Sequence, residues 1–184
     1  MLVEERDIVM KVLIALDSDE SADAIVRTLG PWAIEAKAEV HFLTVLQPGH
    51  VRGTDAGDNP GLEMTPAATS SGQLLHLGKL PHHVAESRSQ AVSRAEAEVH
   101  DKHKELASCF LKGVEFRSHV AMEADIPATV LRVGSEIGAD LVAMGTHGRT
   151  GLRHVLMGSV AENVIRNAPM PVLVVGPKTI LRGD

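Results

Sequence analysis

A glycine-rich segment near the C-terminus has the residue types and the spacing of a phosphate-binding site. Gly145-Thr146-His147-Gly148 follows an apolar run, and nine residues separate it from Gly158-Ser159. Glycine lets main-chain amides approach a ligand closely, and a helix N-terminus offers unpaired N–H groups with a partial positive charge. Together the two parts predict an anion site in which main-chain amides bind the phosphates of a nucleotide.

Side chains within this segment favour the same chemistry. Ser159 and Glu162 have the spacing of a capping box, which predicts that Ser159 caps a helix at this point. Residues 145–159 include Arg149 and Arg153 but no acidic residue, although the chain has a net charge of −6. A local cationic patch suits a polyphosphate, and the alternative is two solvated arginines on a loop.

An aspartate follows the first apolar run of the chain. Asp17 can accept hydrogen bonds from a ribose hydroxyl, or it can cap the helix expected after it, and the two roles are compatible. With Asp19 it forms a candidate pair of ligands for Mg²⁺, which prefers carboxylates beside phosphates. Two acids near a helix start are also common without any metal.

Other residues that could do chemistry do not form a recognisable site. Residues 72–79 lack P-loop spacing, and no G-x-G-x-x-G follows the first apolar run. His100 and His103 share a helix face without a cysteine or acidic set beside them, so we interpret them as solvated histidines rather than metal ligands. Cys109 has no evident base partner and is expected to be a packing residue. We therefore predict no catalytic residues and no metal centre.

Composition limits the class of protein. A length of 184 residues suits one domain over 1–184, and a hydrophobic content of 44% supports a normal core. The net charge of −6 argues against a nucleic-acid surface. The apolar run near the N-terminus is too short to span a membrane. These features predict a cytoplasmic protein with no nucleic-acid or membrane partner.

Apolar runs alternate with helical patterns along the chain, which predicts an α/β fold with an open parallel sheet and ligand binding beyond the carboxyl ends of the strands. The expected strands are 12–16, 40–46, 114–120, 141–144 and 172–175; the expected helices begin after Asp17, run over 82–108, extend from Asp125-Ile126-Pro127 to Gly138, and cover 159–167. If strands 12–16 and 141–144 are neighbours, Asp17 lies beside the loop at Gly145. Residues 47–80 contain 14 Gly, Pro, Ser or Thr and are expected to be a flexible insertion.

Two strands have the pattern of sheet edges. Residues 114–120 alternate between apolar and polar side chains, as in a strand with one wet face. The last strand, Val172, Leu173, Val174 and Val175, is wholly apolar although it should also be an edge. Because an exposed apolar edge invites pairing, we expect a homodimer through this strand, the alternative being a loop that covers it.

The glycine segment resembles the G-2x-G-9x-G(S/T) signature of the ATP-binding branch of the universal stress protein family. The similarity extends to Ile14-Ala15-Leu16-Asp17-Ser18, to Phe42-Leu43-Thr44-Val45, to residues 138–144 before the motif, and to the closing run 169–175. The chain departs from the family pattern at Ala124, where members often carry glycine, and in its long 47–80 segment. Nearly all of the remaining chain is covered.

This resemblance implies a fold and a set of site residues. The fold is a Rossmann-like, adenine nucleotide alpha hydrolase-like α/β sheet of order 3-2-1-4-5 with helices on both faces, in a homodimer. The ligand is ATP or AMP, with Mg²⁺ as a candidate companion. Asp17 and Gly145 would meet the ribose, and the main chains of Ala15 and Val45 would flank the adenine. The phosphates would lie against Gly148, Arg149, Gly158, Ser159 and Val160, with Thr146 and His147 in the same loop.

The expected function is nucleotide binding in a regulatory or stress-response role, rather than rapid turnover. The motif supplies positioning groups but no evident general base, so at most weak ATPase activity is expected. Two alternatives are a slow ATP hydrolase or nucleotidyl-transfer enzyme on the same fold, and an interaction module with a vestigial nucleotide site.

Overall fold

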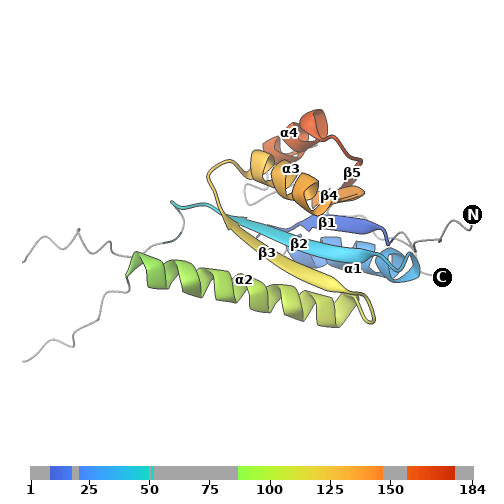
Figure 1. Cartoon of the computed structure of the whole chain (residues 1–184), viewed down its shortest axis with the longest axis horizontal. Helices are drawn as coiled ribbons and strands as arrows, with labels where there is room; N and C mark the ends of the chain where they lie inside the picture. The colour runs from blue at the N-terminus through green and yellow to red at the C-terminus, as the bar shows by residue number, and fades with distance from the viewer. Residues whose placement is uncertain (1–8, 18–20, 50, 52–86, 147–156, 177–184) are drawn as a thin grey trace, which may run out of the picture.

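The computed structural model describes residues 9–17, 21–49, 51, 87–146 and 157–176. Strands and helices alternate along this part of the chain (Figure 1). In chain order they are β1 (Lys11–Ala15), α1 (Ser21–Glu35), β2 (Glu39–Leu46), α2 (Arg88–Phe110), β3 (Phe116–Met122), α3 (Ile126–Ile137), β4 (Leu141–Gly145), α4 (Ser159–Asn167) and β5 (Val172–Val175). Most of the predicted 47–80 insertion lies outside the described residues.

The strands form one five-stranded parallel sheet of order β3-β2-β1-β4-β5, as predicted. The pairing of β1 with both β2 and β4 makes β1 the central strand, and the direction of winding reverses between β1 and β4. β1 is fully apolar at Val12, Leu13 and Ile14, which are buried on both faces of the sheet. Such strands are typical of parallel sheets covered by helices on both sides.

Two hydrophobic layers hold the helices against the sheet. α1 and α2 cover one face, and α3 and α4 cover the other (Figure 1). Val12, Ile14 and Phe42 project into the first layer, while Leu13 and Leu43 project into the second. This alternation follows from the two-residue period of a strand.

Helix ends explain why some boundaries match the sequence prediction and others do not. Asp125 caps α3 by accepting a 3.0 Å hydrogen bond from the amide of Ala128, and Gly138 ends it in the left-handed region at φ 66°. Both ends were predicted. α2 begins at Arg88, later than predicted, because Ser87 and Gln90 form a capping box that starts the helix there. β3 lies two residues beyond the predicted 114–120 and has the predicted edge position, but the predicted alternation is not seen, because Arg117 is exposed and the other six residues of the strand are all half-buried.

Candidate functional site

The two halves of the glycine motif meet at the carboxyl edge of the sheet. β4 ends at Gly145, and the Thr146 amide continues the ladder by donating to the Val175 carbonyl at 3.0 Å. The Thr146 carbonyl then accepts a 2.7 Å hydrogen bond from the Gly158 amide, at the start of α4. A main-chain hydrogen bond therefore connects the residue after β4 directly to the N-terminus of α4.

The end of β1 lies next to this junction. Ala15 pairs with Met144 in the β1–β4 ladder, so Leu16 and Asp17 leave the sheet beside Gly145 and Thr146. This is the neighbourhood predicted for Asp17, and its side chain is partly exposed there. Because the winding reverses between β1 and β4, this part of the carboxyl edge is where open α/β sheets bind ligands.

The N-terminus of α4 differs from its prediction. The N-cap is Gly158 rather than Ser159, and no side chain caps the helix. Ser159 is the first residue of the helix itself, and Glu162 forms a 2.8 Å ion pair with Arg166 one turn later instead of closing a capping box. The predicted capping box is therefore wrong. No described side chain caps the first-turn N–H groups of α4, which can therefore donate to water or to a ligand.

Gly158 does not need to be glycine for backbone reasons. Its φ of −73° and ψ of 154° are extended values that any residue adopts. Ala124, where members of the family often carry glycine, does not need glycine either. Its φ is negative, because Lys37 is the only non-glycine residue with positive φ in the described part of the chain. The absence of a side chain at Gly158 instead leaves room for close approach to the main chain.

The remaining predicted site residues divide into two groups. Val45 lies near the end of β2, and Val160 lies in the first turn of α4, both partly buried. His147, Gly148 and Arg149 lie outside the described residues, as do Asp19 and Arg153.

A buried polar cluster lies close to this edge, between α2 and the sheet. Ser118 Oγ is 2.6 Å from Nδ1 of both His100 and His103, and His103 Nε2 is 3.0 Å from Thr44 Oγ1. Thr44 in turn donates to the Leu16 carbonyl at 3.2 Å. His103 is 1% exposed, so its interpretation as a solvated histidine is wrong. Burial lowers the pKa of His103 to about 4, with smaller contributions from His100 and His119.

A second histidine pair occupies the opposite face of the sheet. His41 Nδ1 and His119 Nε2 are 2.9 Å apart, and His41 Nε2 is 3.1 Å from Glu39 Oε1. Arg117 also pairs with Glu39 at 2.8 Å. Burial lowers the pKa of His41 against the opposing effect of Glu39, and burial followed by His41 and Arg117 lowers the pKa of His119. Both rings are therefore neutral at pH 7.

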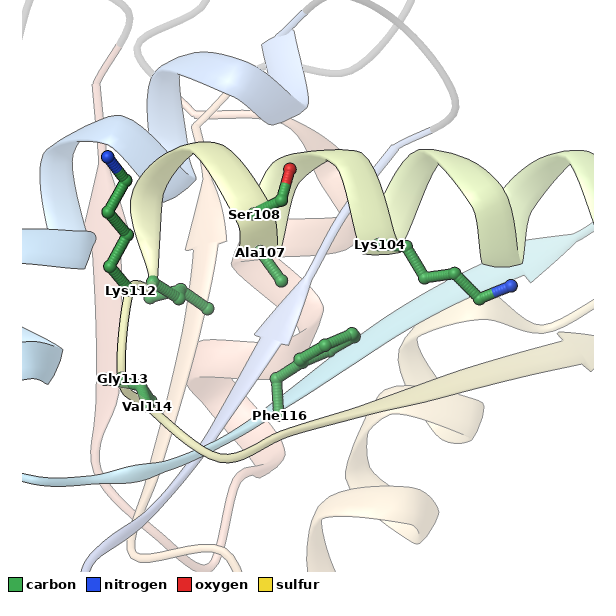
Figure 2. A pocket seen from close by; sticks show the side chains of 8 residues that line it. Lys104, Ala107, Ser108, Lys112, Gly113, Val114 and Phe116 are labelled. Atoms are coloured by element: carbon green, nitrogen blue, oxygen red, sulfur yellow. The ribbon is translucent and has the colours of Figure 1, made fainter.

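A separate pocket of about 440 Å³ opens at the other end of the molecule. It lies between the last turns of α2 and the start of β3, with the Phe116 ring beneath Ala107 (Figure 2). Lys104 and Lys112 stand at its sides. Because β3 begins here, the pocket is at the amino edge of the parallel sheet and is no part of the glycine motif.

Three further observations concern predictions made from the sequence. Within the described residues, no cluster of three or more His, Cys, Asp or Glu could hold a metal ion. Among the helices described, none is long and apolar enough to cross a bilayer. Cys109 is exposed, so its expected packing role is wrong.

The sequence analysis did not identify Thr44 as a residue of interest. It lies in the apolar run of β2 and is 3% exposed. A threonine inside a buried parallel strand must find a hydrogen-bond partner, which was the available signal. The partner, His103, could not be chosen from the sequence because the two residues are 59 positions apart.

Comparison with known proteins decides the family. The model of the universal stress protein family (Usp) matches residues 9–176. The chain belongs to this family. Among its curated relatives, universal stress protein MJ0577 of Methanocaldococcus jannaschii is 26% identical over 91% of this chain and 95% of its own length. Universal stress protein MJ0531 of the same organism is 50% identical, but the matched part is only 31% of this chain and 34% of the relative.

Solved structures agree with the family fold. A structure of MJ0577 superposes with a TM-score of 0.63 at 21% identity, over 92% of this chain and 97% of that one. A universal stress protein in complex with cAMP gives 0.55 at 17% identity, over 92% and 98%. A universal stress protein from Archaeoglobus fulgidus in complex with dAMP gives 0.53 at 19% identity, over 91% and 98%. At these identities the likeness establishes the fold alone.

Proposed function

We propose that this universal stress protein binds an adenine nucleotide, ATP in the first place, at the carboxyl edge of its sheet. The observation that carries the proposal is the 2.7 Å hydrogen bond from the Gly158 amide to the Thr146 carbonyl, which joins the glycine loop to an uncapped helix N-terminus beside Asp17. Two structures of the family were solved with adenine nucleotides, cAMP and dAMP, which supports the choice of base.

Each residue of the site has a proposed role. The Asp17 carboxylate and the Gly145 main chain hold the ribose, and the main chains of Ala15 and Val45 flank the adenine. The Gly158 amide is engaged by Thr146, so the phosphate donors on α4 are the amides of Ser159 and Val160, together with the Ser159 hydroxyl. Gly148 and Arg149 complete the phosphate contacts, with Thr146 and His147 in the same loop.

Binding, rather than rapid turnover, is the proposed activity, in a nucleotide-dependent regulatory role in the stress response. The proposed groups are of the kinds that position a ribose and phosphates, and the motif supplies no evident general base to activate a water molecule. Mg²⁺ would be held by the phosphates with Asp17. Incubation of the protein with Mg²⁺ and ATP should release ADP only slowly, and turnover at rates typical of enzymes, of the order of 10 per second, would contradict this part of the proposal.

The Gly158→Val variant tests the site directly. The backbone at this position accepts valine, so the variant should fold, while the new side chain occupies the space through which phosphate approaches. We expect at least about a tenfold loss of ATP affinity by calorimetry. Circular dichroism and thermal unfolding serve as the control for folding. A folded variant with unchanged affinity would contradict the site.

The identity of the nucleotide is a separate measurement. Mass spectrometry of the acid-extracted native protein should detect ATP, AMP or cyclic AMP carried through purification. Titrations with each nucleotide, with and without Mg²⁺, then rank them. If α4 and the glycine loop bind phosphates as proposed, ATP should bind more tightly than AMP, and Mg²⁺ should affect ATP binding more than AMP binding.

A further inference from the structure

A hydrogen-bonded chain of four side chains runs from α2 through β3 and β2 to the end of β1. It begins at His100, passes Ser118, His103 and Thr44, and ends on the Leu16 carbonyl. Its successive distances are 2.6, 2.6, 3.0 and 3.2 Å. Thr44 and His103 are buried at 3% and 1% exposure, so the inner half of the chain is closed to bulk water.

The protons of this chain can be placed one by one. The single Thr44 hydroxyl proton is donated to the Leu16 carbonyl, so His103 must donate Nε2–H to Thr44 Oγ1. Nδ1 of the neutral ring is then an acceptor, and the Ser118 hydroxyl donates to it. His100 completes the chain by donating Nδ1–H to Ser118 Oγ. Each hydrogen bond in the series then has one donor and one acceptor, and His103 is fixed as the Nε2–H tautomer.

The series of hydrogen bonds from His100 ends at the point where the β1–β2 ladder stops. The last bond of that ladder is from the Leu16 amide to the Leu43 carbonyl at 2.8 Å. The Leu16 carbonyl comes next, and it is held by the Thr44 hydroxyl. This bond fixes the last peptide before Asp17, and Thr44 itself immediately precedes Val45.

We infer that Thr44 and His103 are positioning residues for the nucleotide site: by fixing the Leu16 carbonyl, they set the direction in which β1 presents Asp17 to the ribose. The inference rests on the proposed function. It adds two residues that do not contact the nucleotide, and it makes the packing of α2 against the sheet a determinant of affinity. The alternative is that the chain only anchors α2 and contributes to stability.

Substitutions at Thr44 separate these alternatives. Thr44→Val has nearly the same shape but lacks the hydroxyl, whereas Thr44→Ser keeps it. Thr28→Val is the matched control, because Thr28 is a second threonine buried at 7% exposure, in the middle of α1. ATP affinity is measured by calorimetry for all three variants, and thermal unfolding is measured in parallel.

The expected result is a selective loss of affinity. Thr44→Val should bind ATP about five- to tenfold more weakly, which corresponds to the net contribution of about one hydrogen bond. Thr44→Ser and Thr28→Val should stay within about twofold of the unsubstituted protein. Equal affinity of Thr44→Val and Thr44→Ser, or an equal loss in Thr28→Val, would overturn the inference. If the unsubstituted protein itself binds no adenine nucleotide, the proposed function fails and this role fails with it, a result distinct from the first two.

A second variant and a spectroscopic signature test the far end of the chain. Ser118→Ala removes the donor to His103 Nδ1 and should weaken ATP binding about two- to fivefold, even if Thr44→Val does not fold. Nitrogen NMR of the free protein at pH 7 should find His103 as the Nε2–H tautomer. Unchanged affinity in a folded Ser118→Ala variant, or an Nδ1–H tautomer at His103, would overturn the inference.

Discussion

At the scale of single residues, buried polar side chains link the carboxyl edge of the sheet to α2. Thr44 and His103 replace apolar packing with hydrogen bonds in the layer between α2 and the sheet. A buried polar group that loses its partner costs about 1–3 kcal/mol, so each member of the chain depends on the others. The cluster is therefore sensitive to single substitutions and to pH.

Unfolding should depend on pH through His103. Its pKa is about 4 in the folded protein and 6.5 in the unfolded chain, so between these values the unfolded state binds more protons. The free energy of unfolding should therefore fall as the pH falls from 6.5 towards 4. The full difference corresponds to about 3 kcal/mol, to which His41 and His119 add in the same direction.

The His103→Gln variant tests this dependence. Glutamine keeps an amide donor but does not titrate, so its curve should be flatter over this pH interval, and the difference in free energy of unfolding between the two proteins should shrink as the pH falls. Urea denaturation at steps of half a pH unit measures the effect. Parallel curves for the variant and the unsubstituted protein would contradict it.

At the scale of elements, the helix termini show which structural features a local sequence pattern can predict. Both ends of α3 were predicted from local signals, the Asp125-Ile126-Pro127 start with proline in the first turn and the C-cap Gly138. In the structure the Asp125 carboxylate accepts from the Ala128 amide, and Gly138 adopts positive φ. Ser159 was assigned wrongly as the cap of α4. The bond between Gly158 and Thr146 depends on a loop that brings distant residues together, and no local pattern reports it.

The contact between α1 and α2 depends on a glycine in the middle of α1. A Cβ on Gly30 would lie 2.5 Å from the Phe110 carbonyl oxygen, which is main chain and cannot turn away. Replacing glycine with alanine inside a helix usually stabilises a protein by about 1 kcal/mol. Here the steric cost of the overlap with the Phe110 carbonyl is larger than that gain. Gly30→Ala should therefore lower the free energy of unfolding by about 2 kcal/mol in urea denaturation.

Gly134 in α3 provides a matched control for this substitution. A Cβ there would meet the Met170 Cε atom at 3.3 Å, and a methionine end can move aside. Gly134→Ala should stay within about 1 kcal/mol of the unsubstituted protein. Equal effects of the two substitutions would show that helix propensity, rather than the approach of α2, decides the outcome.

The sheet was predictable at the scale of the whole molecule, because alternating apolar strands and amphipathic helices leave few parallel arrangements. The family resemblance implied the strand order, and the pairing of β1 with β4 places Asp17 beside Gly145 as expected. The chain from His100 to Leu16 was not predictable. These hydrogen bonds depend on how α2 is rotated relative to β3. Packing sets that rotation, and the binary pattern of apolar and polar residues does not encode it.

Strand β5 carries the last prediction, which concerns assembly. It is the edge of the sheet beyond β4, and Leu173 is 39% exposed although all four residues of the strand are apolar. We propose that it pairs with β5 of a second copy, since an apolar edge strand that stays in water is prone to association. A lysine at position 173 can reach solvent in the isolated chain but would be buried in the dimer.

Leu173→Lys should therefore weaken the dimer by about tenfold or more without unfolding the subunit, because burying an uncompensated charge is costly. Analytical ultracentrifugation over a range of concentrations measures the change. Ile34→Lys is the control, since Ile34 is equally apolar and 41% exposed but lies in α1. Dimers of equal affinity in both variants would rule out the β5 interface, and a monomeric unsubstituted protein would rule out the dimer itself.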